Sequence, residues 1–190
     1  MAESNITKNA LKEAMEELMQ EKAFDKISVT DICEKCGMNR KSFYYHFKDK
    51  YDLVNWIFYI GFISNVNLDD YDIETHTPDE SWKLIERLAD YFYKERKFYK
   101  KALMIEGQNS FKDYYREVIT PIISYVMSDL IGEDEYQDFY VATLCDMMIS
   151  ALILWLTSPE PVEPHCMVES YKNMLVRLAH KVTELFPEEK

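Results

Sequence analysis

The chain has 190 residues, of which 47% are hydrophobic, and it contains only four glycines and six prolines. Such a composition supports a full hydrophobic core and excludes a disordered chain, and the scarcity of helix breakers predicts an all-α fold. The net charge of −12 argues against a protein that binds nucleic acid over its whole surface.

The N-terminal segment, MAESNITKNALKEAMEEL, begins directly with an amphipathic pattern. It has no apolar stretch followed by a small-residue cleavage site, so we expect no secretory signal and a cytoplasmic location. Ser4 or Thr7 is expected to cap a first helix that ends near Lys22.

Short helices with turn residues between them are predicted next. Thr30 and Asp31 should open a helix that stops at Gly37, and Asn39 should cap a helix from Arg40 to about His46. Asp49 is then expected to cap a fourth helix. The two short helices and their glycine turn have the dimensions of a helix-turn-helix.

Charge is distributed unevenly along the chain. Residues 1–55 carry nine Lys and Arg against ten Asp and Glu, whereas residues 56–190 carry 13 against 24. Between Lys35 and Lys50 there are five basic residues and one acidic residue. A local basic patch of this kind is what contact with phosphates requires.

The four cysteines include a C-x-x-C pair, Cys33 and Cys36. A redox pair or half of a metal site is the functional alternative, but a structural zinc site needs four ligands and no second pair of cysteines or histidines completes one. We expect neither a metal nor a disulfide. The pair is interpreted as two small apolar side chains on one helix face.

The middle of the chain predicts three helices, from Thr77-Pro78 to about Lys94, from Lys97 to Glu106, and from Ser110 to Ile131 with a kink at Pro121. Aromatic, methionine and polar side chains of this region and of the following helix are candidates for lining a ligand pocket; the alternative is plain core packing. The candidates are Tyr91, Phe98, Met104, Glu106, Asn109, Phe111, Tyr115 and Trp155.

Two helices end the chain, Tyr140–Leu156 and Met167–Phe186, joined by a loop at Ser158–Pro164. The stretch Phe139–Thr157, which includes the first, is as long as a short membrane span, but Asp146 lies at its middle, so we expect a core or interface helix and no membrane. The two helices together are the predicted dimer surface. The last one carries an apolar stripe, formed by Met174, Leu175, Leu178, Val182 and Leu185.

A family resemblance emerges at residues 36–53. CGMNRKSFYYHFKDKYDL resembles the helix-turn-helix signature of the TetR family of transcriptional regulators, and the preceding VTDICEKCGMN is similar to the family's second helix and turn, with cysteine where alanine is usual. The resemblance covers residues 5–55. RKFYKKALMIEGQNSF is similar to C-terminal regions of a Gram-positive branch that includes regulators of dihydroxyacetone kinase operons.

The resemblance implies two parts, a helix-turn-helix domain at residues 1–50 and a helical regulatory and dimerisation domain at residues 51–190. Phe43 and Phe47 are expected to face the core. Arg40 and Lys41 are expected to read bases, and hydroxyls and lysines to hold phosphates. The full set of expected DNA contacts is Thr30, Arg40, Lys41, Ser42, Tyr44, Tyr45, His46, Lys48 and Lys50.

The expected function is a sequence-specific repressor that binds a palindromic operator in double-stranded DNA as a homodimer and is released by a small-molecule or other effector, with no cofactor. The alternative is an activator or co-regulator of the same fold that docks a partner protein. An enzyme is not expected, because the nucleophile, phosphate-binding and metal-binding motifs of enzymes are missing and the histidines are scattered.

Overall fold

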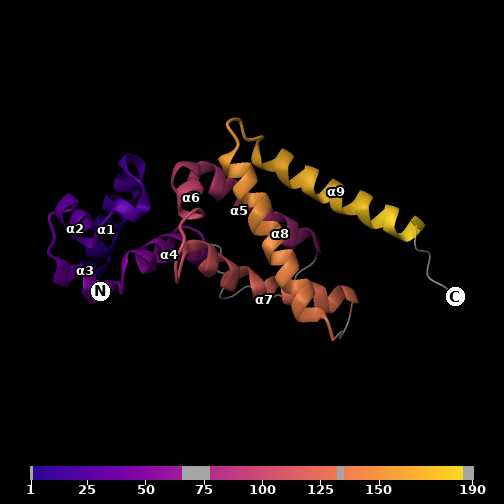
Figure 1. The fold of residues 1–190 in the computed structure, drawn as a ribbon, viewed down its shortest axis with the longest axis horizontal. Helices are drawn as coiled ribbons and strands as arrows, with labels where there is room; N and C mark the ends of the chain where they lie inside the picture. The colour runs from indigo at the N-terminus through magenta and orange to yellow at the C-terminus, as the bar shows by residue number, and fades with distance from the viewer. Residues whose placement is uncertain (1, 66–77, 132–134, 186–190) are drawn as a thin grey trace.

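In a computed structural model of the chain, residues 2–65, 78–131 and 135–185 are described, and every regular element among them is helical (Figure 1). This confirms the predicted all-α fold. The elements of these described residues are α1 Ala2–Glu21, a 3-10 turn Phe24–Lys26, α2 Val29–Lys35, α3 Arg40–His46, α4 Lys50–Gly61, a 3-10 turn Ile63–Asn65, α5 Pro78–Lys94, α6 Arg96–Ala102, α7 Phe111–Ile131, α8 Gln137–Thr157 and α9 Pro164–Leu185.

Helices α1 to α3 form a small unit at one end of the molecule, which we call the head (Figure 1). Its core takes side chains from all three helices, among them Met15, Ile32 and Phe43, each at 0% exposure. Phe47 follows α3 and is buried as well, at 3% exposure. Phe43 and Phe47 therefore face inward, as their four-residue spacing predicts.

Two predicted helix starts are wrong. Helix α1 begins at Ala2, so Ser4 and Thr7 lie inside it. Helix α2 begins at Val29 rather than Thr30, because Ser28 and Asp31 form a capping box: the Ser28 hydroxyl accepts from the Asp31 amide at 3.1 Å, and the Asp31 carboxylate accepts from the Ser28 amide at 2.6 Å. The hydrogen bond from the Ser28 amide lowers the pKa of Asp31 to about 2.

The next two predicted caps are confirmed. The Asn39 side chain accepts a hydrogen bond from the Ser42 amide at 2.9 Å, at the start of α3. The Asp49 carboxylate accepts from the amides of Tyr51 and Asp52 at 2.8 and 2.9 Å, at the start of α4. Gly37, at φ +68°, makes the turn between α2 and α3 in a conformation that favours glycine.

Helices α5 to α9 form the larger part of the molecule, which we call the body, and α4 connects it to the head (Figure 1). Helix α6 ends at Ala102, four residues before the predicted end at Glu106, because the amides of Met104 and Ile105 bond three residues back and the chain then turns at Gly107, with φ +121°. The predicted cap Thr77, the helix stop Gly132 and the helix end Phe186 lie outside the described residues.

Helices α7 and α8 pack against each other. The first half of α9 packs along α5, and its second half extends beyond the other helices of the body (Figure 1). Among the described residues, one helix, α8, is long and apolar enough to cross a membrane by length and composition alone. Its Asp146 is paired with Arg116 of α7, and its buried residues pack within the body. The buried residues are Val141, Cys145, Ile149, Leu152, Trp155 and Leu156.

Candidate nucleic-acid interface

Helix α3 presents a polar and aromatic face to solvent. Arg40 and Lys41 begin the helix and are exposed, and Tyr44 and Tyr45 follow with 50% and 83% of their surface exposed. Lys48 is exposed just beyond the end of the helix. We call these five residues the α3 surface. Two exposed tyrosines among three cations are unusual for a surface that only faces water.

The packing of the head fixes the direction of this surface. Phe43 and Phe47 anchor α3 with a ring-centroid separation of 5.8 Å, and the Phe47 ring packs against Trp56 of α4 at 5.4 Å. The Asn39 cap holds the first turn of α3. Since one face is locked in the core, the residues between the two phenylalanines must point outward.

Contacts within the α3 surface are weak enough to be exchanged for contacts with a ligand. The Arg40 guanidinium reaches the Tyr44 hydroxyl at 3.5 Å and lies 5.8 Å from the centre of its ring. Tyr45 lies edge-on to His46, with centroids 4.8 Å apart. His46 is half-buried, and burial lowers the pKa of its imidazole.

The other residues expected to contact DNA fall into two groups. Thr30, in the first turn of α2, is exposed and available, while Ser42 is half-buried and its hydroxyl donates to Asn39 at 3.3 Å. Lys50 is different. Its ammonium donates to the carbonyls of Phe24 and Ile27 at 2.7 and 2.8 Å, so it connects α4 to the first 3-10 turn and does not face solvent with Lys48.

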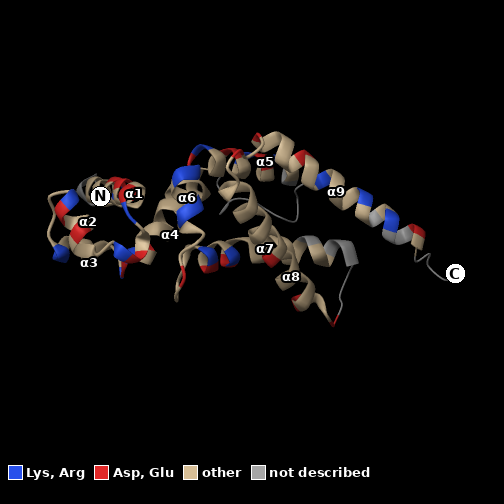
Figure 2. Cartoon of the chain, turned by 45° about the horizontal axis from the view of Figure 1, so that its top comes forward, with Lys and Arg blue, Asp and Glu red and all other residues tan. Residues whose placement is uncertain are grey.

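Ion pairing in the head explains how a segment with no net positive charge still has a cationic face. Lys35 pairs with Glu17 and Glu21, at 3.0 and 2.8 Å, and Lys22 pairs with Asp31 at 3.1 Å. None of the ion pairs found among the described residues involves the α3 surface. Neutralisation elsewhere leaves the three cations of the α3 surface outside these ion pairs, and Lys8 of α1 adds a fourth, with its ammonium over the rings of Phe47 and Trp56. Figure 2 shows that the body carries acidic segments along its helices.

The expected pocket residues are divided between a closed core and the surface. Tyr91, Phe111 and Tyr115 surround the ring of Phe58 in α4, with centroids 6.1, 5.4 and 5.8 Å away. Tyr99, beside Phe58, shares a hydroxyl hydrogen bond of 2.7 Å with Tyr91. We call the rings around Phe58 the aromatic core; they are Phe62, Tyr91, Phe92, Tyr99, Phe111, Tyr114 and Tyr115.

The remaining pocket candidates lie apart from that core or at its edge. Phe98 is buried beside Tyr99, at 5.0 Å between centroids. Trp155 stacks on Tyr93, and its ring N–H donates to the Val162 carbonyl at 2.9 Å. Met104, at 60% exposure, Glu106 and Asn109 are on the surface.

A surface depression of about 360 Å³ lies where α4 meets the start of α7. Its lining is mainly polar, and Asn109 is the one expected pocket residue that contributes to it. Asn109 has φ +63°, and its backbone carbonyl accepts from the side-chain amide of Asn55 at 3.4 Å. The lining residues are Asn55, Gln108, Asn109, Asp113, Tyr114 and Glu117.

Sequence analysis missed Phe58, the central ring of the aromatic core. A signal was present in the sequence, because Leu53, Val54, Ile57 and Phe58 are all apolar and occupy more than one face of α4. A short helix that is apolar on adjacent faces is covered on both of them.

Comparison with known proteins agrees with this division into head and body. Residues 11–57 match the family model described as bacterial regulatory proteins, tetR family, and residues 79–177 match a model described as a transcriptional regulator C-terminal region. The two matches together span most of the head, most of α4 and most of the body.

Individual relatives match over different lengths. A dhaKLM operon transcriptional activator of Lactococcus lactis, DhaS, is 36% identical over 67 residues, which is 35% of this chain and 36% of that protein. An HTH-type transcriptional regulator of Staphylococcus aureus is 23% identical over 88% of this chain and 89% of its own length. The structure of NalD of Pseudomonas aeruginosa, a secondary repressor of a multidrug efflux pump, covers 92% of this chain and 96% of its own at TM-score 0.69 and 18% identity.

Proposed function

The chain belongs to the TetR family of DNA-binding transcriptional regulators, and from this premise we propose that it is a repressor that binds a palindromic operator as a homodimer and is released by an effector. The α3 surface is the observation that carries the proposal. Members of the family are soluble and typically cytoplasmic, and we assign this chain the same location.

In the proposed complex, α3 enters the major groove. Arg40 and Lys41, at the start of the helix, reach base edges, where an arginine or lysine donates to the two acceptors of guanine. Lys48, Thr30 and one of the exposed tyrosines contact phosphates and fix the register of the helix on the duplex. Ser42 and His46 are half-buried beside this surface and support it from within.

A homodimer is proposed because one helix-turn-helix makes too few contacts for tight, specific binding, and members of the family usually act as dimers. The outer faces of α8 and α9 are the proposed interface. Phe139 and Leu154 of α8 are 67% and 73% exposed, and Leu178 and Leu185 of α9 are 59% and 61% exposed. Exposed apolar side chains of this size are typical of a surface that a partner covers.

Release by an effector would act through the body. Tyr91, Phe111 and Tyr115 are the proposed contacts for a small molecule, because they pack on Phe58 of α4, the helix that leads into the head. An effector that separates these rings must move Phe58. Binding energy would then be coupled to the position of α4.

A second candidate function is an activator or co-regulator that docks a partner protein. The packing favours it at one point: the rings of the aromatic core contact one another directly, and Tyr115 is only 4% exposed. A protein partner would need no cavity there. The L. lactis relative carries the name of an operon activator.

The test is fluorescence anisotropy of the purified protein on DNA from upstream of its own gene, against scrambled DNA, across a salt series. We expect preference for the upstream fragment, with affinity that falls steeply as salt rises. Arg40→Ala and Lys41→Ala should each weaken and relax this preference. Lys26→Ala is the matched control, since Lys26 is an exposed head lysine paired only with Asp25.

Two further measurements separate the alternatives. A reporter gene behind the upstream fragment should be silenced by the protein if it is a repressor and induced if it is an activator. Operator affinity and sequence preference that stay unchanged in both Arg40→Ala and Lys41→Ala would contradict the assignment of the α3 surface. Elution as a monomer at micromolar concentration would contradict the dimer.

A further inference from the structure

Helix α6 carries two cations that point to opposite parts of the molecule. Lys101, at its last turn, donates from its ammonium to the carbonyl of Met19 and, at 3.3 Å, to that of Gln20, at the end of α1 in the head. Arg96, at its first turn, donates to the carbonyl of Leu156 at 2.8 Å and to that of Ser158, at the end of α8. A seven-residue helix is therefore fixed to the ends of two helices far apart in sequence.

Both contacts satisfy groups that a helix end leaves unpaired. The last four carbonyls of an α-helix have no partner within it, and the C-terminal end of the helix dipole attracts a cation. Neither α1 nor α8 has a basic residue in its own last turn. The cap of each helix is therefore supplied from α6.

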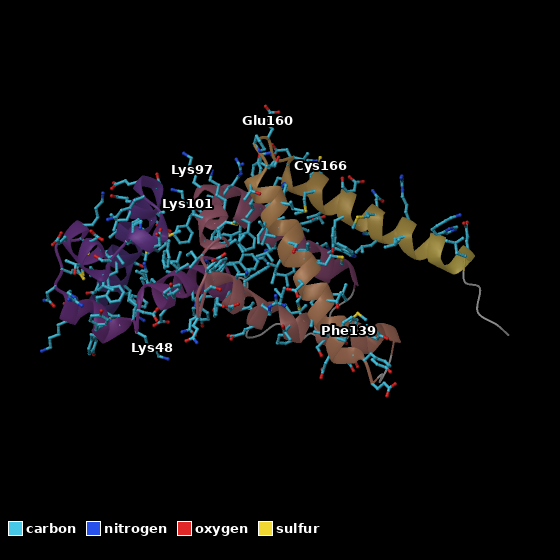
Figure 3. All side chains as sticks on the ribbon, in the orientation of Figure 1. Lys48, Lys97, Lys101, Phe139, Glu160 and Cys166 are labelled. Carbon is cyan, nitrogen blue, oxygen red and sulfur yellow. The ribbon has the colours of Figure 1, made fainter. Side chains whose placement is uncertain are left out.

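The position of Lys101 makes this contact a second connection between head and body. The first is α4, which is continuous in the chain. Lys101 reaches α1 instead, across 81 residues of sequence, and Figure 3 shows it between α6 and the end of α1. Lys97 lies on the same helix and is exposed.

We propose that Lys101 and Arg96 are positioning residues for DNA binding: α6 ties the orientation of the head to the end of α8 through the two caps. The link matters because a dimer binds two half-sites about one helical turn apart, so each head must be held at one angle to its body. The part of this proposal that concerns DNA rests on the proposed function.

The same link connects the end of α8 to the head. Helix α8 has an exposed apolar face at Phe139 and Leu154, and its end is fixed to α6 by Arg96. Any movement of the α8 end, whether from an effector or from the arrangement of two chains, is carried by α6 to the end of α1. Loss of either cap should loosen the head by a route that leaves α4 intact.

The experiment measures the distance from head to body directly. Spin labels are placed on Lys26→Cys in the head and on the native exposed Cys166 at the start of α9, in a Cys36→Ser background, with labelled chain diluted in a large excess of unlabelled chain. Double electron–electron resonance then reports the intrachain distance whether or not the protein is a dimer or binds DNA. Cys33 and Cys145 are buried.

Lys101→Met and Arg96→Met should each broaden or shift this distance distribution, because methionine keeps an unbranched apolar stem and removes the charge. Lys101→Arg should restore a narrow distribution, and Lys97→Met should match the wild type. Operator affinity should fall by about three- to tenfold in the two methionine variants and remain unchanged in Lys97→Met. If Lys101→Met does not fold, Lys101→Gln takes its place.

A head-to-body distance that is the same in Lys101→Met and the wild type would overturn the proposal, even if affinity fell. An unchanged distance in Arg96→Met would overturn it too, because the end of α8 would then not influence the head. If the wild type shows no operator preference, the proposed function fails while the distance measurement still decides whether α6 holds the head.

Discussion

The head and the body are specified by different kinds of interaction. In and next to the head, a helix is capped by the side chain of the residue that directly precedes it. Ser28, Asn39 and Asp49 cap α2, α3 and α4 in this way. In the body, the central packing joins rings from α4, α5, α6 and α7, between positions as far apart as Phe58 and Tyr115. Local signals of the first kind are visible in a sequence, and the second kind depends on the whole fold.

The comparison predicts that the body should suffer most from the loss of one central ring. Phe58→Ala removes the ring that seven others contact and should reduce the free energy of unfolding by about 3–5 kcal/mol. Chemical denaturation followed by circular dichroism measures this change. Tyr45→Ala, which removes an exposed ring from the head, is the control and should change stability little.

The contact between Gly61 and Tyr91 offers a sharper test of the same core. A Cβ atom at Gly61 would lie 2.1 Å from the Tyr91 hydroxyl, so Gly61→Ala should destabilise the protein by about 2 kcal/mol through overpacking. Adding Tyr91→Phe removes that oxygen and should recover part of the loss. A double mutant no more stable than Gly61→Ala would show that the hydroxyl is not the obstacle.

A third prediction separates two lysines of the head that sequence alone treats alike. Lys50→Met should cost about 1.5 kcal/mol, because it leaves two carbonyls without their charged donor, and should leave the salt dependence of DNA binding nearly unchanged. Lys48→Met should leave stability unchanged and make the slope of log affinity against log salt shallower by about two units, one for each chain of the dimer. The reverse pattern would exchange their roles.

The smallest predicted effect concerns a carboxyl group where the head meets the body. Burial raises the pKa of Glu16 in α1, which faces Glu95. The pKa of this carboxyl is higher in the folded state than in the unfolded chain, so its protonated form favours folding. Its contribution to the free energy of unfolding is full below the unfolded pKa and is lost as pH rises through the folded pKa. Glu16→Gln should therefore gain stability relative to wild type as pH rises through this window. Thermal melts at paired pH values measure it; Glu13→Gln, at an exposed position, is the control.

The contrast between local and long-range interactions also explains which features could be predicted from the sequence. Gly37, Asn39 and the phenylalanine spacing of α3 were sufficient to predict the helix-turn-helix and its exposed face. Lys50 was grouped with Lys48 because no pattern reveals that its ammonium reaches the carbonyls of Phe24 and Ile27, which lie more than 20 residues earlier. The structural role of Lys50 follows from which groups lie close to its ammonium in the fold, and the residue type alone does not reveal it.

The pocket candidates show the same limit in the body. Tyr91, Phe111 and Tyr115 were expected to lie together, and they do, but they pack on Phe58, which sequence analysis left out. Met104 and Glu106 were grouped with them by position along the chain. The early end of α6 instead places both on the surface. Whether a ligand binds these residues remains a prediction.

The sparse charge of the α3 surface affects how the protein would search a chromosome. Three cations on each α3 surface imply that a dimer displaces few counterions there, with a salt slope no steeper than about −5 even if all six cations neutralised phosphates. The acidic body repels the phosphates of any DNA sequence, and only an operator offers base contacts that offset this repulsion. Non-operator DNA would then be a poor reservoir, most molecules would diffuse freely between visits, and occupancy of the operator would follow changes in the number of molecules without delay.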